Sequence, residues 1–316
     1  MPEWLTERGI GETRAVLLDG GEIVEARIEV EGTTPAGSVI AARLATGGTR
    51  NAIARDNAAT EYLLPRGAPG VTEGAKLAIE VTREAIPGSE PWKRPLARLT
   101  DAPLRQAPPL PGRELSLPAP LDQLRAAGWH ELIDQARSGL VPFGGGELRI
   151  SPTPAMTLID VDGHLPPAEL AVAGARAAAA AIRRLDIGGS IGIDLPTVGS
   201  KAVRQAAAGA IDAILRQPFE RTAVNGFGFI QIVRARQRAS LVEHAQDRAA
   251  FEARALLRSA AFAKPGSQRL AAHPAVAGVL DAHPDWLERL SRQVGGEVGL
   301  RADPAIPMSG GYVEAA

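Results

Sequence analysis

Apolar and polar residues alternate in the first part of the chain. Residues 22–31 place an apolar side chain at every second position, and Gly20 and Gly21 separate them from the apolar run at residues 14–19. A period of two with one apolar face predicts a half-buried strand, and a tight Asp-Gly turn between two such runs predicts a hairpin. Residues 37–86 hold further short runs separated by Gly, Pro and Asn, as expected of a small β-barrel.

In the middle of the chain, short apolar runs alternate with helical patterns. We expect strands at residues 146–151, 156–161, 190–195 and 223–234, and helices at residues 166–185 and 200–215. The order from residue 156 onward is strand, helix, strand, helix, strand, which predicts βαβ units with parallel neighbouring strands. The Pro-rich residues 87–120 predict an extended crossing segment, and residues 243–316 predict a small α/β domain.

Composition and charge exclude several classes of protein. The chain has 316 residues and no Cys, which excludes a disulfide scaffold, a Cys-based zinc site and a thiol nucleophile. Its 35 Lys and Arg balance 36 Asp and Glu, so it lacks the overall positive charge of many nucleic-acid-binding proteins, although local basic patches are allowed. No apolar run is long enough to span a membrane, and the first residues lack the apolar region of a signal peptide. We therefore expect a cytoplasmic protein with no membrane partner.

Two aspartates stand at the ends of apolar strands in the βαβ region, Asp160 after MTLI and Asp194 after SIGI. Parallel strands of one βαβ unit end at the same edge of a sheet, and adjacent strands lie about 5 Å apart. Two carboxylates that close favour a divalent cation between them, and Mg²⁺ accepts such ligands. Asp162 is a candidate third ligand. The structural alternatives are that a strand-end Asp caps the next turn or helix, and that Asp162 lies in an exposed loop.

Basic residues at two places are candidate contacts for a phosphate backbone. Lys93 and Arg94 follow Trp92, whose ring could stack on a base. Arg234 and Arg236 alternate after an apolar strand. Phosphate contact and an ordinary charged edge are equally compatible with this spacing.

Three stretches around the two aspartates resemble the ribonuclease E/G family. FGGGELRISPTPAMTLIDVDG at residues 143–163 is similar to the family's Gly-Gly, strand and Ile-Asp-(Val/Ile)-Asn-Ser motif. RRLDIGGSIGIDL at residues 183–195 resembles its second metal motif, and NGFGFIQIVRARQR at residues 225–238 its Arg-Phe-Gly strand. Position by position, the resemblance places Asp160 and Asp194 on the family's Mg²⁺ ligands and Asp162 on the Asn of the motif.

The resemblance also implies an architecture, a multi-subdomain fold of mixed α+β and α/β class. Its parts would be a truncated RNase H-like subdomain at residues 1–36 and 101–142, an inserted OB-type RNA-binding barrel at residues 37–100, a catalytic metal-binding subdomain at residues 143–242, and a small C-terminal α/β domain at residues 243–316. Lys93 lies near a family Lys of the barrel. The phenylalanines that stack on RNA in the family's barrel are replaced, and Tyr62 is the nearest substitute.

Two parts of the longer family members are missing. Only about forty residues separate the barrel from FGGGEL, which leaves no room for the 5′-end-sensing domain. The zinc-linking Cys-x-x-Cys is absent, so we expect no zinc and no zinc-linked dimer.

The resemblance therefore implies a Mg²⁺-dependent endoribonuclease, with Mn²⁺ able to substitute, that hydrolyses phosphodiester bonds in single-stranded RNA during RNA processing or decay. Asp160 and Asp194 would be catalytic as metal ligands, with Asp162 accessory. Arg234, Arg236, Lys93 and Tyr62 would contact RNA. The alternatives are a non-catalytic RNA-binding protein of the same descent and a phosphoesterase acting on another substrate.

Overall fold

The computed structural model describes residues 1–88, 93–117 and 121–315. The chain divides into two compact units. Unit 1 combines residues 1–31, 110–131 and 244–316, and unit 2 combines residues 32–109 and 132–243. In the described part of the chain, the helices are all too short or too polar to cross a membrane.

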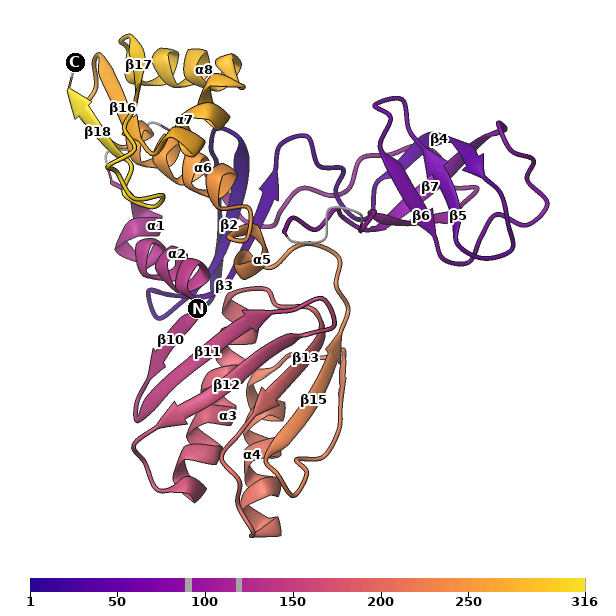
Figure 1. The fold of residues 1–316 in the computed structure, drawn as a ribbon, viewed down its shortest axis with the longest axis vertical. Helices are drawn as coiled ribbons and strands as arrows, with labels where there is room; N and C mark the ends of the chain where they lie inside the picture. Colours follow the sequence, from indigo (N-terminus) through magenta and orange to yellow (C-terminus); the bar gives the residue numbers. More distant parts are fainter. Residues whose placement is uncertain (89–92, 118–120, 316) are drawn as a thin grey trace. The chain divides into compact units, whose positions relative to one another are not determined.

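The first part of unit 2 is a closed five-stranded barrel, which confirms the small barrel expected from the sequence (Figure 1, purple). Its strands follow the order β4-β5-β6-β8-β7 around the barrel. They are β4 (Val39–Thr46), β5 (Ala52–Arg55), β6 (Glu61–Leu64), β7 (Lys76–Arg83) and β8 (Leu96–Leu99). The core of the barrel consists mainly of Ala, Leu, Ile and Val, and Tyr62 is the aromatic residue among them.

The second part of unit 2 is a six-stranded sheet with the order β10-β11-β12-β13-β15-β14. Its strands are β10 (Leu140–Phe143), β11 (Gly146–Pro152), β12 (Thr157–Gly163), β13 (Gly189–Asp194), β14 (Phe219–Arg221) and β15 (Phe229–Arg234). Strands β12 and β13 are parallel, as the βαβ pattern predicts, and the other neighbouring pairs are antiparallel.

The expectation that the third strand of the βαβ pattern also runs parallel to its neighbour was wrong. The helix after β13 leads into the edge strand β14, which runs in the direction of β13 because both are antiparallel to β15. The chain then reverses through residues 222–228, and β15 inserts between β13 and β14. The single strand expected at residues 223–234 begins with part of that turn, and the three-residue strand β14 that precedes it was not expected.

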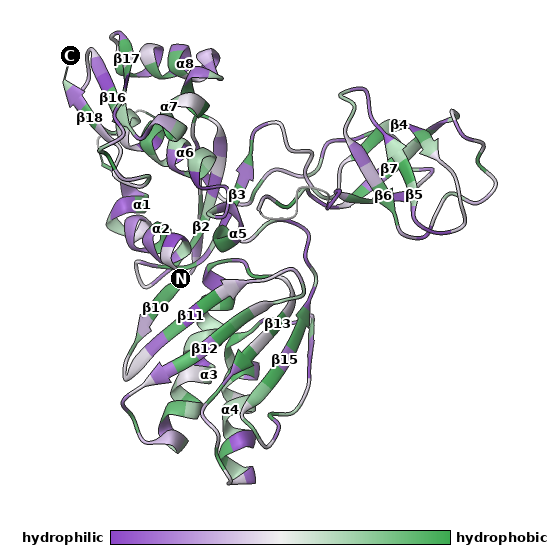
Figure 2. Ribbon diagram, viewed as in Figure 1, coloured by the Kyte–Doolittle hydropathy of each residue, from purple (hydrophilic) through white to green (hydrophobic). Residues whose placement is uncertain are grey.

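Helices α3 (Pro167–Arg184) and α4 (Lys201–Ile214) pack on one face of this sheet and on each other (Figure 1). The approach of α3 to the sheet is close, because a Cβ atom at Gly174 would lie 2.3 Å from Cγ1 of Val161. Figure 2 shows hydrophobic and hydrophilic residues alternating along β11 and β12. Ile159 of β12 and Ile193 of β13 are buried on the helix-covered face. Successive side chains of a strand point to opposite faces, so the residue next to each of them in sequence lies on the face opposite the helices.

Unit 1 joins both ends of the chain. One sheet has the order β3-β2-β1-β9, and a second has the order β17-β16-β18. The elements are β1 (Glu3–Arg8), β2 (Glu12–Asp19), β3 (Glu22–Val30), β9 (Arg113–Leu115), α1 (Gln123–Ala126), α6 (Arg248–Ala261), β16 (Gln268–Ala272), α7 (Pro274–Asp281), α8 (Pro284–Val294), β17 (Val298–Ala302) and β18 (Tyr312–Ala315). Helices α2 (Trp129–Ser138) and α5 (Leu241–His244) span the boundaries between the units. The antiparallel hairpin of β2 and β3 confirms the prediction for residues 14–31. The C-terminal segment shares its core with Ile10.

Buried charges connect the segments of unit 1. Three arginines and three carboxylates alternate in one chain of ion pairs, with hydrogen bonds of 2.7 to 2.9 Å. In order they are Arg254, Glu12, Arg14, Glu7, Arg258 and Asp122. Burial alone would raise the pKa of Glu12, but Arg14 and Arg254 outweigh it and hold that pKa below its ordinary value. The charges of the six side chains cancel, which makes their burial tolerable.

Candidate functional site

A row of four side chains crosses the sheet of unit 2 on the face opposite α3 and α4. Arg149 of β11 pairs with Asp160 of β12, Asp160 pairs with Asp194 of β13, and Asp194 pairs with Phe229 of β15. Directly paired residues of neighbouring strands project to the same side of a sheet. The predicted adjacency of the two aspartates on parallel strands is therefore confirmed, and the row adds a cation on one side and an aromatic ring on the other.

The two aspartates serve no structural role among the described residues. Both are exposed, and no hydrogen bond or ion pair there involves either carboxylate. Ser200 is the N-cap of α4, where its Oγ accepts a hydrogen bond from the backbone N–H of Val203, and Pro166 occupies the N-cap position of α3. Neither aspartate therefore caps a helix, and the capping alternative does not explain them.

The face around the row is acidic. Asp162 follows Asp160 on the same face and pairs across the strands with Glu147. Arg149 is the neighbouring cation, and its closest acidic partner is Glu147, at 3.9 Å between guanidinium nitrogen and carboxylate oxygen. Four carboxylates and one guanidinium leave an excess of negative charge, and an anion approaches such a surface only when a cation neutralises it.

The donor set fits Mg²⁺ better than a metal that needs a complete protein cage. Among residues 1–88, 93–117 and 121–315, no three His, Cys, Asp or Glu side chains gather in a way that could hold a metal ion. The pair Asp160 and Asp194 is therefore not joined by Asp162 in one cluster. Two carboxylates on adjacent strands, whose backbones lie about 4.8 Å apart, suit Mg²⁺, because this ion usually keeps several waters and takes one or two carboxylates from the protein.

The turn before β15 lies directly beyond Asp194. The backbone N–H of Leu195 donates to the oxygen of Gly228 at 3.2 Å. The Asn225 side chain accepts hydrogen bonds from the backbone N–H groups of Phe227 at 2.9 Å and Phe229 at 3.0 Å. This places two phenylalanines beside the acidic pair. The motif NGFGF contains both, but the sequence alone does not say that its turn meets the end of β13.

The structure places Arg234 and Arg236 away from the acidic pair. Arg234 pairs with Gly189 at the start of β13, five residues from Phe229 along the strand, which corresponds to about 17 Å. Its guanidinium donates to the backbone oxygen of Ile187, and Arg236 forms an ion pair with Glu243. These contacts support a structural role at that end of the sheet, and the geometry does not bring either arginine to the aspartates.

The barrel residues expected to guide RNA differ in their burial and in their contacts. Tyr62 is only 1% exposed, so the expectation of an available ring is corrected: the alternation of EYLL turns Tyr62 and Leu64 into the core. Lys93 is half-buried in the connection between β7 and β8, and Arg94 forms an ion pair with Glu61. Trp92 lies outside the described residues.

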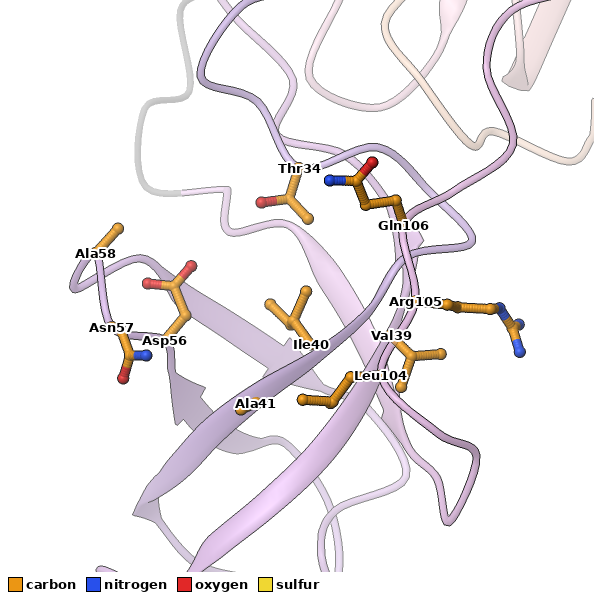
Figure 3. Close-up of a pocket in the computed structure, with 10 residues that line it drawn as sticks. All are labelled: Thr34, Val39, Ile40, Ala41, Asp56, Asn57, Ala58, Leu104, Arg105 and Gln106. Atoms are coloured by element: carbon orange, nitrogen blue, oxygen red, sulfur yellow. The ribbon is translucent and has the colours of Figure 1, made fainter.

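A pocket of about 600 Å³ lies on the barrel near the Tyr62 hydroxyl (Figure 3). The hydroxyl contacts Oγ1 of Thr34 at 3.0 Å and Oδ2 of Asp56 at 3.1 Å, and both of these residues line the pocket. Burial raises the pKa of the Tyr62 phenol, and the neighbouring Asp56 carboxylate adds to this effect. The phenol therefore stays neutral, and its hydroxyl contacts two of the residues that line the pocket.

Comparison with known proteins adds no family assignment, because neither a protein-family model nor a curated protein matches the chain. The similarity to ribonuclease E/G therefore stays a prediction that rests on three motifs. Of the residues singled out from the sequence, the structure brings Asp160 and Asp194 together. Sequence reasoning missed Arg149, although the alternation in GELRIS places it on the exposed face.

Proposed function

We propose that this protein is a Mg²⁺-dependent endoribonuclease that hydrolyses phosphodiester bonds in single-stranded RNA. The observation that carries the proposal is the direct pairing of Asp160 with Asp194 on adjacent parallel strands, both exposed and on one face. Two like charges held together without a structural partner are a recurrent feature of sites that bind a cation.

Asp160 and Asp194 would hold the ion, and Asp162 would accept hydrogen bonds from its waters. Mg²⁺ bound here would supply a water of lowered pKa and stabilise negative charge on the phosphate. Arg149, next to Asp160 in the row, would contact a non-bridging phosphate oxygen. The excess of carboxylates on this face keeps the phosphate away until the cation is present.

We also propose that the barrel is of OB type and binds RNA, within the family architecture that the sequence resembles. Support comes from its five strands, its order 1-2-3-5-4, and the parallel pairing of its third and fifth strands. Lys93 and the neighbouring Arg94 are the candidate backbone contacts. A backbone contact by Arg234 and Arg236 stays a prediction, at a point distant from the aspartates.

A non-catalytic RNA-binding protein is the second candidate. It requires only the barrel and basic residues, and no metal ion at Asp160 and Asp194. Both candidate functions include RNA binding, and they differ in whether the protein cleaves the RNA backbone.

Incubation of the protein with a labelled, unstructured RNA in Mg²⁺ or in EDTA separates these candidates. We expect cleavage in Mg²⁺ and none in EDTA, and we expect a circular RNA of the same sequence to be opened, because an endonuclease needs no free end. RNA that is bound but stays intact at every Mg²⁺ concentration would refute the enzyme and favour the second candidate. Absence of both binding and cleavage would refute both.

A further inference from the structure

Phe227 is an aromatic side chain left open to solvent at the candidate site. It is 81% exposed, whereas Phe229 is half-buried. Among the described residues, the other exposed aromatic side chain is Tyr312, in unit 1. No ring contact within the described residues involves Phe227. A large apolar surface is thus presented to solvent in the turn that precedes β15.

The backbone that carries Phe227 is held on both sides. Its N–H donates to the Asn225 side chain at 2.9 Å, and its carbonyl accepts from Oγ1 of Thr197 at 3.0 Å. Gly228 follows with φ +95°, where a Cβ atom would lie 2.1 Å from the oxygen of Leu195. Glycine is therefore required at position 228, and the backbone conformation of the turn is fixed. A fixed turn that presents an exposed ring loses little conformational freedom when the ring is covered.

The turn lies against the end of the strand that carries Asp194. Leu195 donates its N–H to Gly228, and Phe229 pairs directly with Asp194. The ring of Phe229 reaches over Gly192, where a Cβ atom would lie 2.6 Å from its Cζ. Phe229 thus fills the sheet face next to the aspartates, and Phe227 lies two residues before it in the turn that meets the end of β13.

We propose that Phe227 stacks on an unpaired base of the nucleotide next to the scissile phosphate, an inference that rests on the proposed function. An aromatic ring stacks on any of the four bases, so it provides binding without sequence specificity. It can do so only when the base is not stacked within a duplex, so it selects single-stranded RNA. The barrel lacks an exposed aromatic side chain among its described residues, and Phe227 supplies the stacking surface at the sheet.

The test compares steady-state cleavage of an unstructured RNA in Mg²⁺ by the wild type and three variants. Phe227→Ala should raise KM about fivefold or more with little change in kcat, because base stacking of the usual strength corresponds to that factor or a larger one. Phe227→Trp should restore KM close to that of the wild type. The matched control is Leu121→Ala, which removes an apolar side chain of 65% exposure in unit 1 and should change neither constant.

A second arm uses RNAs with one abasic nucleotide at each position around the cleavage site. At one of these positions, loss of the base should make the KM of Phe227→Ala equal to that of the wild type. An unchanged KM for Phe227→Ala, or a deficit that persists on every abasic RNA, would refute the stacking role while leaving a cleaving wild type in place. A wild type that cleaves no RNA would refute the proposed function itself, and with it a role for Phe227 beside a scissile phosphate.

Discussion

Removal of Arg258 should destabilise unit 1 strongly. Its guanidinium donates to both carboxylate oxygens of Glu7, at 2.8 and 2.9 Å, and to both oxygens of Asp122, at 2.7 and 2.9 Å. In Arg258→Ala, Asp122 loses its ion-pair partner and Glu7 keeps only Arg14. A buried ion pair that loses one member usually costs about 3–5 kcal/mol, out of a total free energy of unfolding of about 5–15 kcal/mol.

This loss should appear as a large shift in the melting temperature of unit 1. At about 4 °C per kcal/mol for a unit of this size, the expected decrease in Tm is about 12–20 °C. Tryptophan fluorescence is a suitable probe, because three of the four tryptophans, Trp4, Trp129 and Trp286, belong to unit 1. The guanidinium carbon of Arg258 lies 5.9 Å from the centre of the Trp129 ring, so the emission of Trp129 reports on this region directly.

The matched control for Arg258→Ala is Arg8→Ala in the same unit. Arg8 forms an ion pair with Glu114 at 3.0 Å, but both side chains are exposed. Exposed pairs contribute about 0–1 kcal/mol, so this variant should melt within a few degrees of the wild type. Equal decreases in Tm for the two variants would refute the conclusion that the buried charges hold the segments of unit 1 together.

Three further predictions follow from the charges and from the short segment between the barrel and FGGGEL. Burial would raise the pKa values of Glu12 and Asp122, but their arginine partners hold both below the ordinary values of 4.5 and 3.8. The stability that the two carboxylates provide is complete above these ordinary values and is lost as the pH falls through the folded-state pKa values. The Tm measured against pH should therefore decrease below about pH 4.5. Arg149→Ala should lower kcat/KM about tenfold or more, as expected for loss of a charged hydrogen bond to phosphate, whereas an unchanged kcat/KM would remove Arg149 from the site. RNAs with a 5′-monophosphate, with a 5′-hydroxyl, or circular should be cleaved at similar initial rates, and a preference above about tenfold, worth about 1.4 kcal/mol, would reveal a 5′-end pocket.

The sequence predicts the part of the candidate site that lies on β12 and on its parallel neighbour β13. The alternation in MTLIDVD places Asp160 and Asp162 on one face, and the helix between β12 and β13 makes the two strands parallel neighbours. The same alternation in EYLLP shows that Tyr62 and Leu64 share a face, but the sequence does not say which face is the core. Tyr62 was therefore wrongly expected to have an exposed ring.

Contacts that depend on strand order, or that join segments far apart in the sequence, could not be predicted from the sequence. Arg149 lies beside Asp160, and Phe229 beside Asp194, because of the register of antiparallel neighbours, which apolar periodicity does not fix. The insertion of β15 depends on a strand of only three residues, Phe219–Arg221, which is too short to show a period. Arg258 meets Glu7 across 251 positions of sequence, and no local pattern indicates such a partner.

The central claim is that Asp160 and Asp194 form the catalytic metal site, and the most direct test is the initial rate of RNA cleavage in Mg²⁺ by Asp160→Asn and Asp194→Asn. Each change removes one negative charge and keeps nearly the same shape. The matched control is Asp19→Asn, which alters another exposed aspartate at the end of a strand, in β2. Loss of cleavage in both site variants, with unchanged Tm and with wild-type cleavage by Asp19→Asn, is the predicted result. Undiminished cleavage by a stable Asp160→Asn or Asp194→Asn protein would contradict the account.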